Sequence, residues 1–367
     1  MDIDSLITKP TLLLDKQKTI RNIERMIAKA NHSNVRFRPH FKTHQSAEIG
    51  EWFREHGVDA ITVTSVDMAN YFANHGWKDI TIAFPVNLRQ LSEINQLAAK
   101  ITLNLLVESR EAAEQLVTGV TSPVNIWLKI DTGYHRAGLD WQDYKGITAV
   151  ARTIDQAHNL HLAGLLTHSG HSYGARTPEE ARAIYQSTVQ RLQAGKDTLQ
   201  NQGMETAVSI GDTPTCSLID TFEGVDEIRP GNFVFYDLMQ AQIGACSLDN
   251  ISVAVACPVV AKHPERGQII IYGGAVHFSK EQLRRSDDTP CFGRLARLTQ
   301  DGWEAISDAS HITSLSQEHG IVQVESYLQD RIQIGDYLLV LPVHSCLTAN
   351  LLKRYLTLDG EWIEMMR

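Results

Sequence analysis

The chain has 367 residues, 43% hydrophobic and 21% charged, which is enough for two globular domains and too many for a small disulfide-stapled module. The net charge of -9 disfavours a nucleic-acid partner, which requires a basic surface, and favours small molecules. The first ten residues are acidic and polar, and nowhere do about 18 apolar residues run together. We therefore expect a cytoplasmic protein that has no membrane partner.

The first two-thirds of the chain alternates between apolar, β-rich runs and amphipathic helical patterns. A first run at 11–15 precedes eight others, and helical spacing of apolar residues occurs between them, for example at 17–30, 46–56 and 179–202. The eight runs lie at 35–41, 60–65, 80–86, 101–107, 125–131, 162–169, 207–211 and 227–234. Strand and helix repeated eight times predict an α/β fold, a TIM-type (β/α)8 barrel.

After about residue 240, strands follow one another with short turn-rich links and without long helical patterns. The predicted strands lie at 252–263, 267–274, 291–298, 321–325 and 336–344. We therefore place the barrel at 16–240 and a mainly β domain at 241–367. The strand at 10–15 belongs either to this β domain or to the barrel.

Active sites of such barrels lie at the C-terminal ends of the strands, where this sequence carries polar groups. Lys42 follows the first barrel strand, between His40 and His44. Beside two imidazoles that can carry positive charge, its pKa would be depressed and its amine suited to Schiff-base chemistry. The alternative is a lysine that merely extends to solvent at the barrel edge. Further polar residues at strand ends are Asp131, His135, Arg136, His168, His171 and Tyr173.

The last two barrel strands end in GDTPT (211–215) and RPGN (229–232). Barrels commonly bind phosphate here, through backbone N–H groups and a helix N-terminus. Gly211, Thr213, Thr215, Gly231 and Asn232 fit that need. GDTPT is equally compatible with a plain helix start that has Thr213 as its N-cap. Together with Lys42, these segments describe a site for pyridoxal phosphate.

In the predicted β domain, His344 and Cys346 alternate within an extended run, so both should project from the same face. An imidazole and a thiolate suit Zn²⁺, and the remaining positions would be open to substrate. The alternative is an incidental H-x-C in a half-buried strand. Glu318 and His319 in SQEHG (316–320) are weaker candidates for supporting or acid–base roles.

These motifs together resemble a known family. RPHFKTHQ, KIDTGYHRAGL, THSGHSYG, GDTPT, RPGNFVFYD, SQEHG and PVHSCLTANL resemble, in that order, the D-serine dehydratase and D-threonine aldolase group. This group belongs to the alanine-racemase-like (fold type III) pyridoxal phosphate enzymes. Two departures bear on substrate range: Asp212 stands where many members have serine or glycine, and Gln317 where glutamate is common.

The resemblance implies roles for individual residues. Lys42 would carry pyridoxal 5'-phosphate, with Arg136 near its ring and His168 and Tyr173 lining it. Gly211, Thr213, Gly231 and Asn232 would hold its phosphate. His344 and Cys346 would bind zinc or another divalent metal.

The resemblance also implies a function, namely a lyase that acts on D-amino acids with a β-hydroxyl group. The H-x-C pair resembles zinc-dependent D-serine dehydratases, whereas D-threonine aldolases of this group often show H-x-D. We therefore expect a D-serine dehydratase, with a D-threonine aldolase as the alternative. An amino-acid racemase and a non-catalytic pyridoxal phosphate carrier are weaker alternatives. A homodimer is expected by the same resemblance.

Overall fold

The computed structural model describes residues 3–299 and 302–367, which form two compact units. We call residues 25–42 and 50–231 the barrel unit, and the described residues up to 24 together with 43–49 and 232–367 the β unit. The chain passes from one unit to the other at the peptide bonds Lys42–Thr43 and Gly231–Asn232, among others. Both of these bonds join neighbours in the motifs that the sequence analysis selects.

The barrel unit contains eight parallel strands in the spatial order β2-β10-β9-β8-β6-β5-β4-β3, with the short β7 paired to β6. Their bounds are β2 (Arg36–Phe37), β3 (Ala60–Val63), β4 (Asp79–Pro85), β5 (Thr102–Val107), β6 (Val124–Asp131), β7 (Leu139–Asp140), β8 (Leu160–Leu166), β9 (Ala207–Ile210) and β10 (Glu227–Ile228). A bridge between His40 and Thr62 links the two edge strands, so the barrel is nearly closed. The predicted barrel is confirmed.

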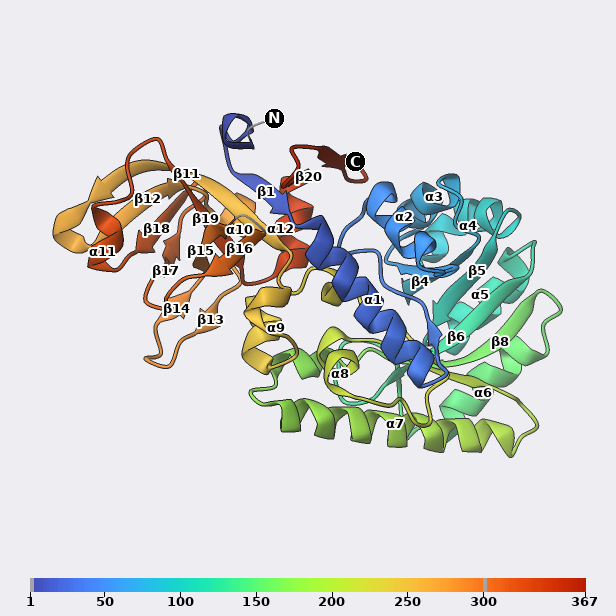
Figure 1. Cartoon of the computed structure of the whole chain (residues 1–367). Coiled ribbons are helices and arrows are strands. Elements are labelled where there is room, and N and C mark those ends of the chain that lie inside the picture. Colours follow the sequence, from blue (N-terminus) through green and yellow to red (C-terminus); the bar gives the residue numbers. More distant parts are fainter. Residues whose placement is uncertain (1–2, 300–301) are drawn as a thin grey trace. The chain divides into compact units, whose positions relative to one another are not determined.

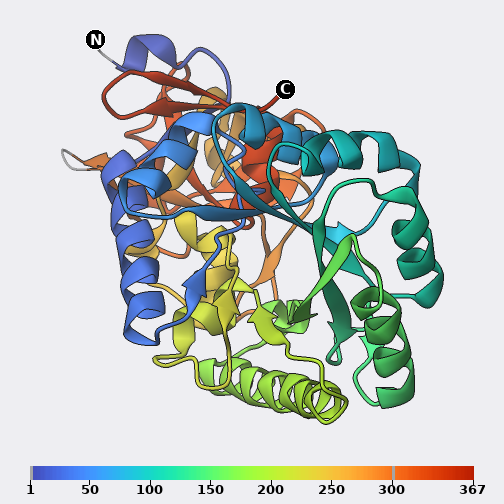
Figure 2. The same cartoon turned by 90° about the vertical axis from the view of Figure 1, so that its right-hand side faces the viewer.

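Helices lie outside these strands, as Figure 2 shows for the cyan to green part of the chain. They begin where the sequence offers capping side chains: Ser65, Ser109 and Thr177 each accept a hydrogen bond from the first turn. The helices are α1 (Lys16–His32) and α2 (Ala47–Glu55), which each belong to both units, α3 (Val66–Asn74), α4 (Leu91–Ala98), α5 (Arg110–Gly119), α6 (Tyr144–Asp155), α7 (Pro178–Gln200) and α8 (Thr213–Leu218).

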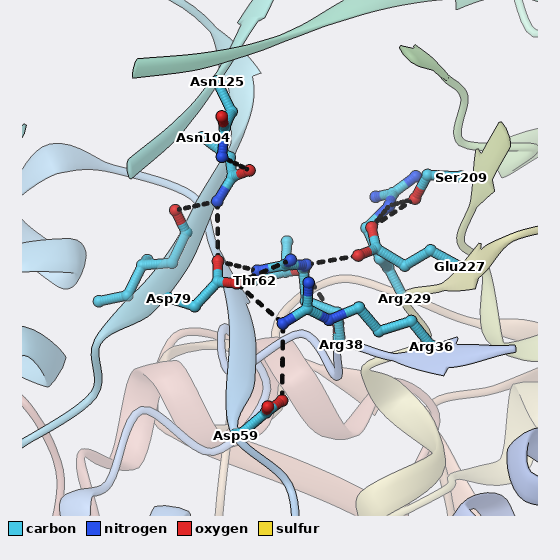
Figure 3. A network of polar contacts seen from close by, with 11 residues as sticks. Arg36, Arg38, Asp59, Thr62, Asp79, Asn104, Asn125, Ser209, Glu227 and Arg229 are labelled. Atoms are coloured by element: carbon cyan, nitrogen blue, oxygen red, sulfur yellow. Dashed lines mark hydrogen bonds and ion pairs between the residues drawn. The ribbon is translucent and has the colours of Figure 1, made fainter. Parts of the chain in front are cut away.

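The barrel interior holds a network of paired charges, which Figure 3 shows. Arg38 is 2% exposed and donates hydrogen bonds to Glu227 (2.6 Å) and Asp79 (2.5 Å). Ser209 links Glu227 to Arg229, since its hydroxyl donates to Glu227 and accepts from the Arg229 Nε, both at 2.7 Å. Burial disfavours the charge on Arg38, but Glu227 and Asp79 outweigh it and raise its pKa.

The β unit contains a mainly antiparallel sheet in the order β12-β18-β17-β15-β19-β11-β1-β20-β21, with β16 paired to β15. In chain order its strands are β1 (Thr11–Leu14), β11 (Val253–His263), β12 (Gln268–Tyr272), β15 (Gly293–Thr299), β16 (Gly302–Ala305), β17 (His311–Leu315), β18 (His319–Gln323), β19 (Tyr337–Pro342), β20 (Arg354–Thr357) and β21 (Trp362–Glu364). Strand β1 pairs antiparallel with β11 and parallel with β20.

Shorter elements complete the β unit (Figure 1). They are the hairpin β13 (Leu283–Arg284) and β14 (Pro290–Cys291), and the helices α9 (Leu238–Ile243), α10 (Ala275–Phe278), α11 (Ser326–Gln329) and α12 (Ser345–Leu352). None of these four helices is predicted from the sequence, because each is only one or two turns long and shows little helical periodicity. In the part of the chain that the structure describes, no helix has the length and apolar character needed to span a membrane.

Candidate active site

Lys42 follows strand β2 at the C-terminal end of the barrel and is half-buried. Its backbone N–H donates to His40 Nδ1 at 3.3 Å, and the His40 N–H donates to the Pro230 carbonyl at 2.9 Å. The preceding Phe41 is fully buried, with its ring 5.0 Å from that of Phe53. The backbone before and at Lys42 is therefore fixed, and the RPGN segment lies beside it.

The expectation that two charged imidazoles flank Lys42 is wrong for His44. His44 is fully buried, and this burial lowers its pKa to about 3. Its Nδ1 accepts a hydrogen bond from the Ser46 N–H at 3.2 Å, as an uncharged ring can. At neutral pH the ring is therefore uncharged and cannot depress the pKa of Lys42.

His168 follows the end of β8, and the positive charge of Lys42 contributes to lowering its pKa. Burial lowers the pKa of His168 well below its ordinary value, and the charges of Lys42, Lys129 and Arg136 lower it further. Its Nδ1 is hydrogen-bonded to the Gly211 carbonyl, so Nδ1 carries the proton and Nε2 keeps its lone pair. The structure thus brings His168 together with the predicted glycine.

A tight turn after β6 carries Arg136. Asp131 Oδ1 accepts the backbone N–H groups of Gly133, Tyr134 and His135 at 2.9, 3.0 and 3.1 Å, which fixes the turn. The Arg136 guanidinium is exposed and lies over the Tyr134 ring, 5.0 Å from its centre.

The first turn of α8 begins in GDTPT, as the helix-start interpretation expects, but its N-cap is Asp212 and not Thr213. Asp212 accepts from the Thr215 N–H, the Thr215 hydroxyl and the Ser172 hydroxyl, each at 2.8 Å. Burial raises its pKa to about 6 despite these bonds. Its carboxylate is thus engaged within the protein.

Two more of the predicted residues meet at this turn. The Thr213 N–H donates to the Tyr173 hydroxyl at 3.3 Å. At Gly211 a Cβ atom would lie 2.9 Å from the Arg229 Cβ and 3.0 Å from its carbonyl oxygen, so this close approach of two backbone segments requires glycine.

Two buried cations near these residues escape the sequence analysis. Lys129, in β6, is 6% exposed, and its burial together with Arg229 and Arg136 lowers its pKa to about 7. Arg229 is 4% exposed and donates to the Thr167 carbonyl at 2.5 Å. The only signal in the sequence is a charged residue within each apolar run. This surplus of cations, with Gly211 in a cradle that a Cβ would fill, fits an anionic cofactor such as pyridoxal phosphate.

His344 and Cys346 lie at a strand-to-helix turn, which corrects the predicted extended run. Strand β19 ends at Pro342, His344 is the N-cap of α12, and Cys346 is in the first turn of that helix. The two side chains nevertheless interact. Burial lowers the pKa of His344, but its hydrogen bond with Cys346, followed by the charges of Cys346 and Asp237, outweighs burial and raises it to about 9.

The donor set at this turn fits a soft divalent metal. His344 Nδ1 is buried and has no hydrogen-bond partner among the described residues, so its lone pair or proton is unsatisfied. Imidazole and thiolate are ligands that Zn²⁺ prefers. Among residues 3–299 and 302–367 there is no cluster of three or more His, Cys, Asp or Glu side chains suited to a metal.

Three candidate residues remain, namely Glu318, His319 and Asn232. Glu318 faces His277 of α10, at 3.9 Å from its Nε2, and His319 begins β18 with an exposed side chain. The side-chain amide of Asn232, predicted for the phosphate, donates to Asp237 and also lies 3.5 Å from the Cys346 sulfur. Its predicted contact with phosphate would therefore use the backbone N–H.

A parallel barrel with a lysine after its first strand, followed by a β unit, is the architecture of the alanine-racemase-like pyridoxal phosphate enzymes. Residues 14–238 match the family "Alanine racemase, N-terminal domain", and residues 252–358 match "Putative serine dehydratase domain". The chain belongs to this fold type III family, in the branch that carries the serine dehydratase domain.

The chain is similar along its whole length to named enzymes. It is 30% identical to a D-serine dehydratase of Dictyostelium discoideum, over 98% of this chain and 95% of that one. It is 29% identical to the D-threo-3-hydroxyaspartate dehydratase of Delftia sp. strain HT23, whose solved structure covers 100% of this chain and 99% of that one with a TM-score of 0.91. A further structure of that dehydratase is described as a cysteine-to-alanine mutant in the metal-free form.

More distant structures share the fold. The D-threonine aldolase of Filomicrobium marinum has a TM-score of 0.82 at 21% identity, over 97% of this chain and 94% of that one. Relatives named as dehydratases and aldolases place the chain among the lyases of this family.

Proposed function

We propose that this protein is a pyridoxal phosphate- and metal-dependent D-serine dehydratase that converts D-serine to pyruvate and ammonia. The observation that carries the proposal is the pairing of His344 with Cys346 at the start of α12, in a chain whose barrel places Lys42 after its first strand. The named relatives support a dehydratase.

The barrel residues would hold the cofactor. Lys42 would attach it, Gly211, Thr213, Gly231 and Asn232 would bind its phosphate, and Arg136, His168 and Tyr173 would line it. When bound, pyridoxal phosphate supplies a ring system that takes up electrons from the substrate's α-carbon. The Lys42 amine would be the base that takes the α-proton of the substrate. His168 would stay neutral because its burial and the nearby cations lower its pKa, and the hydrogen bond of its Nδ1 proton to the Gly211 carbonyl would orient its ring.

The residues of α12 would hold the metal. His344 and Cys346 would bind it, and the coordination positions that this pair does not fill would be open to the substrate. We propose Zn²⁺, on the preference of an imidazole and a thiolate, and its contribution would be Lewis acidity at the β-hydroxyl group as that group departs. The metal-free form named for a relative supports a metal in this branch.

A second substrate is favoured by the similarity to the D-threo-3-hydroxyaspartate dehydratase, which is 29% identical over 98% of this chain. Such a substrate has the same β-hydroxyl group and an additional carboxylate. Retro-aldol cleavage of D-threonine would use the same cofactor and metal residues, with a base that takes the proton of the β-hydroxyl group. The H-x-C pair makes this aldolase reaction the weaker candidate.

The deciding experiment incubates the pyridoxal-loaded protein with D-serine, D-threo-3-hydroxyaspartate or D-threonine, with and without EDTA. Keto acid and ammonia from D-serine, lost with EDTA and restored by Zn²⁺, are expected. Keto acid from hydroxyaspartate alone would change the substrate, and glycine with acetaldehyde from D-threonine would make the protein an aldolase. EDTA-insensitive inversion would indicate a racemase, and no turnover of any substrate a carrier.

Three further expectations are part of this proposal. The domains divide near residue 240, as the two family matches at 14–238 and 252–358 support. The protein acts as a homodimer, and its location is the cytoplasm. Sedimentation of the purified protein and fractionation of its cells test these last two.

A further inference from the structure

The sulfur of Cys346 has hydrogen-bonding neighbours from two other segments of the β unit. The Thr43 hydroxyl oxygen lies 3.2 Å from it, and the Asn232 side-chain nitrogen 3.5 Å. Thr43 is fully buried and Asn232 is 3% exposed, so water does not replace them freely. Because a thiolate can only accept, a deprotonated Cys346 receives a hydrogen bond from the Thr43 hydroxyl. It also accepts from the Asn232 amide, whose second N–H it shares with the Ser345 hydroxyl oxygen at 3.0 Å.

Asp237 fixes one of these donors and the metal-binding turn at the same time. It is fully buried, and its Oδ2 accepts from the Asn232 amide at 2.6 Å, the Ser345 N–H at 2.9 Å and the Ser345 hydroxyl at 3.3 Å. Its Oδ1 caps α9 through the Gln240 N–H at 3.0 Å. One carboxylate thereby ties residue 232 to the residue between His344 and Cys346.

The segment that carries Thr43 is also fixed from both sides. The Tyr355 hydroxyl donates to the His44 carbonyl at 2.8 Å, and the Met366 N–H donates to the Gln45 carbonyl at 2.7 Å. The Thr43 hydroxyl is therefore held at the sulfur by the backbone around it. These contacts make both donors preorganised, and they require no rearrangement when Cys346 loses its proton.

We propose that Thr43 and Asn232 are positioning residues for the metal pair, which donate hydrogen bonds to the Cys346 thiolate, and that Asp237 orients Asn232 and Ser345 for this purpose. The inference rests on the proposed function, since it takes His344 and Cys346 as metal ligands. Hydrogen bonds to a thiolate stabilise its charge and withdraw electron density from the sulfur. The metal is then bound in a fixed geometry and remains a stronger Lewis acid for the substrate hydroxyl.

The test replaces the bound metal with Co²⁺, whose thiolate-to-metal charge-transfer band reports on the sulfur directly. Thr43→Val removes the hydroxyl at constant shape, and Thr43→Ser retains it as the matched control. We expect the Val variant to shift the band to lower energy and to bind metal about tenfold more weakly in competition with a chelator. The Ser variant should keep both wild-type values.

Two further variants extend the test, and circular dichroism of each checks folding. Asn232→Leu should shift the cobalt band in the same direction as Thr43→Val. Asp237→Asn keeps the volume but weakens the carboxylate contacts, so it should weaken metal binding with a smaller band shift. If Asp237→Asn fails to fold, the comparison of Thr43→Val with Thr43→Ser still tests the inference.

The outcomes separate this inference from the proposed function. A cobalt band in the wild type that is unchanged in energy and affinity in Thr43→Val overturns the inference alone. A wild-type protein that takes up no metal and shows no band overturns the metal assignment and the inference with it. A band that moves equally in the Val and Ser variants shows that the hydroxyl is not responsible and rejects the role of Thr43.

Discussion

The barrel unit buries a group of interacting charged side chains, whereas the sheet of the β unit has an apolar core, and the two environments suit different ligands. In the barrel unit Arg38, Lys129, Glu227 and Arg229 are all less than 10% exposed. In the β unit the strand segment from Val253 to Cys257 is fully buried and apolar. The barrel unit thus presents basic side chains and backbone N–H donors, which fit an anionic cofactor. The β unit presents the imidazole of His344 and the sulfur of Cys346 at the start of α12, a pair that fits a soft metal.

The two units also stabilise these groups differently. In the barrel unit a buried cation is acceptable because carboxylates on neighbouring strands pair with it, as Glu227 and Asp79 do with Arg38. In the β unit Cys346 interacts with the imidazole of His344, and the Thr43 hydroxyl oxygen and the Asn232 side-chain nitrogen lie 3.2 and 3.5 Å from its sulfur. The same difference should appear when individual residues are changed.

The largest effect on activity should come from replacing Lys42, and comparison with a His344 variant separates cofactor attachment from metal binding. Lys42→Ala should remove the protein-linked absorbance of pyridoxal phosphate and lower activity by at least about 100-fold, because the cofactor loses its attachment and the α-proton its base. His344→Ala should keep that absorbance and lose the response to Zn²⁺. Absorption spectra and metal analysis of both variants test this, and a protein-linked band retained in Lys42→Ala would contradict the assignment.

The next effect concerns buried charge in the barrel. Arg38→Met should lower the free energy of unfolding by about 3–5 kcal/mol, because it leaves Glu227 and Asp79 buried without their cation. Arg36→Met is the control, since Arg36 is 45% exposed and its ion pairs with Asp59 and Asp79 should contribute about 1 kcal/mol or less. Urea unfolding of the two variants gives the comparison. Equal losses would show that burial of the pair does not decide the cost.

The free energy of unfolding should depend on pH through His44, a buried imidazole in the β unit. Burial lowers the folded-state pKa of His44 to about 3, below its ordinary value of 6.5. The stability that it contributes is therefore complete above pH 6.5 and is lost as the pH falls toward 3, by up to about 5 kcal/mol.

His44→Gln keeps an acceptor for the Ser46 N–H but cannot take up a proton. The difference in unfolding free energy between wild type and variant should therefore shrink as the pH is lowered from 7 to 4, as measured by urea midpoints. Parallel curves over this range would show that His44 is protonated in the folded protein.

The smallest effect is one of thiol reactivity. Burial raises the pKa of Cys216 to about 12 and raises that of Cys257 further, so both should resist alkylation until the protein unfolds. Cys346 is half-buried and should be labelled in the native protein, and more slowly when Zn²⁺ is present. Mass spectrometry of peptides after timed alkylation measures this. Labelling of Cys346 that Zn²⁺ does not slow would contradict the assignment of Cys346 as a ligand.

Local pattern was sufficient for most of the fold. The apolar runs that predict the eight barrel strands coincide with β2 to β6 and β8 to β10, because each run is long enough to be buried and ends in turn residues. The prediction was wrong at PVHSC, where the apolar run of β19 continues into α12 without a charge or glycine to mark the change. A two-residue boundary of this kind has no periodicity of its own.

By itself, the sequence determined the periodicity of its strands and helices and the polar residues that follow each barrel strand, because both depend on neighbours a few positions away. Only the tertiary structure decided which of these side chains meet. Arg38 reaches Glu227 across 189 positions, and Thr43 reaches Cys346 across 303. Such contacts depend on how distant segments pack, so the buried charges and the donors around the sulfur emerge only when the chain is folded.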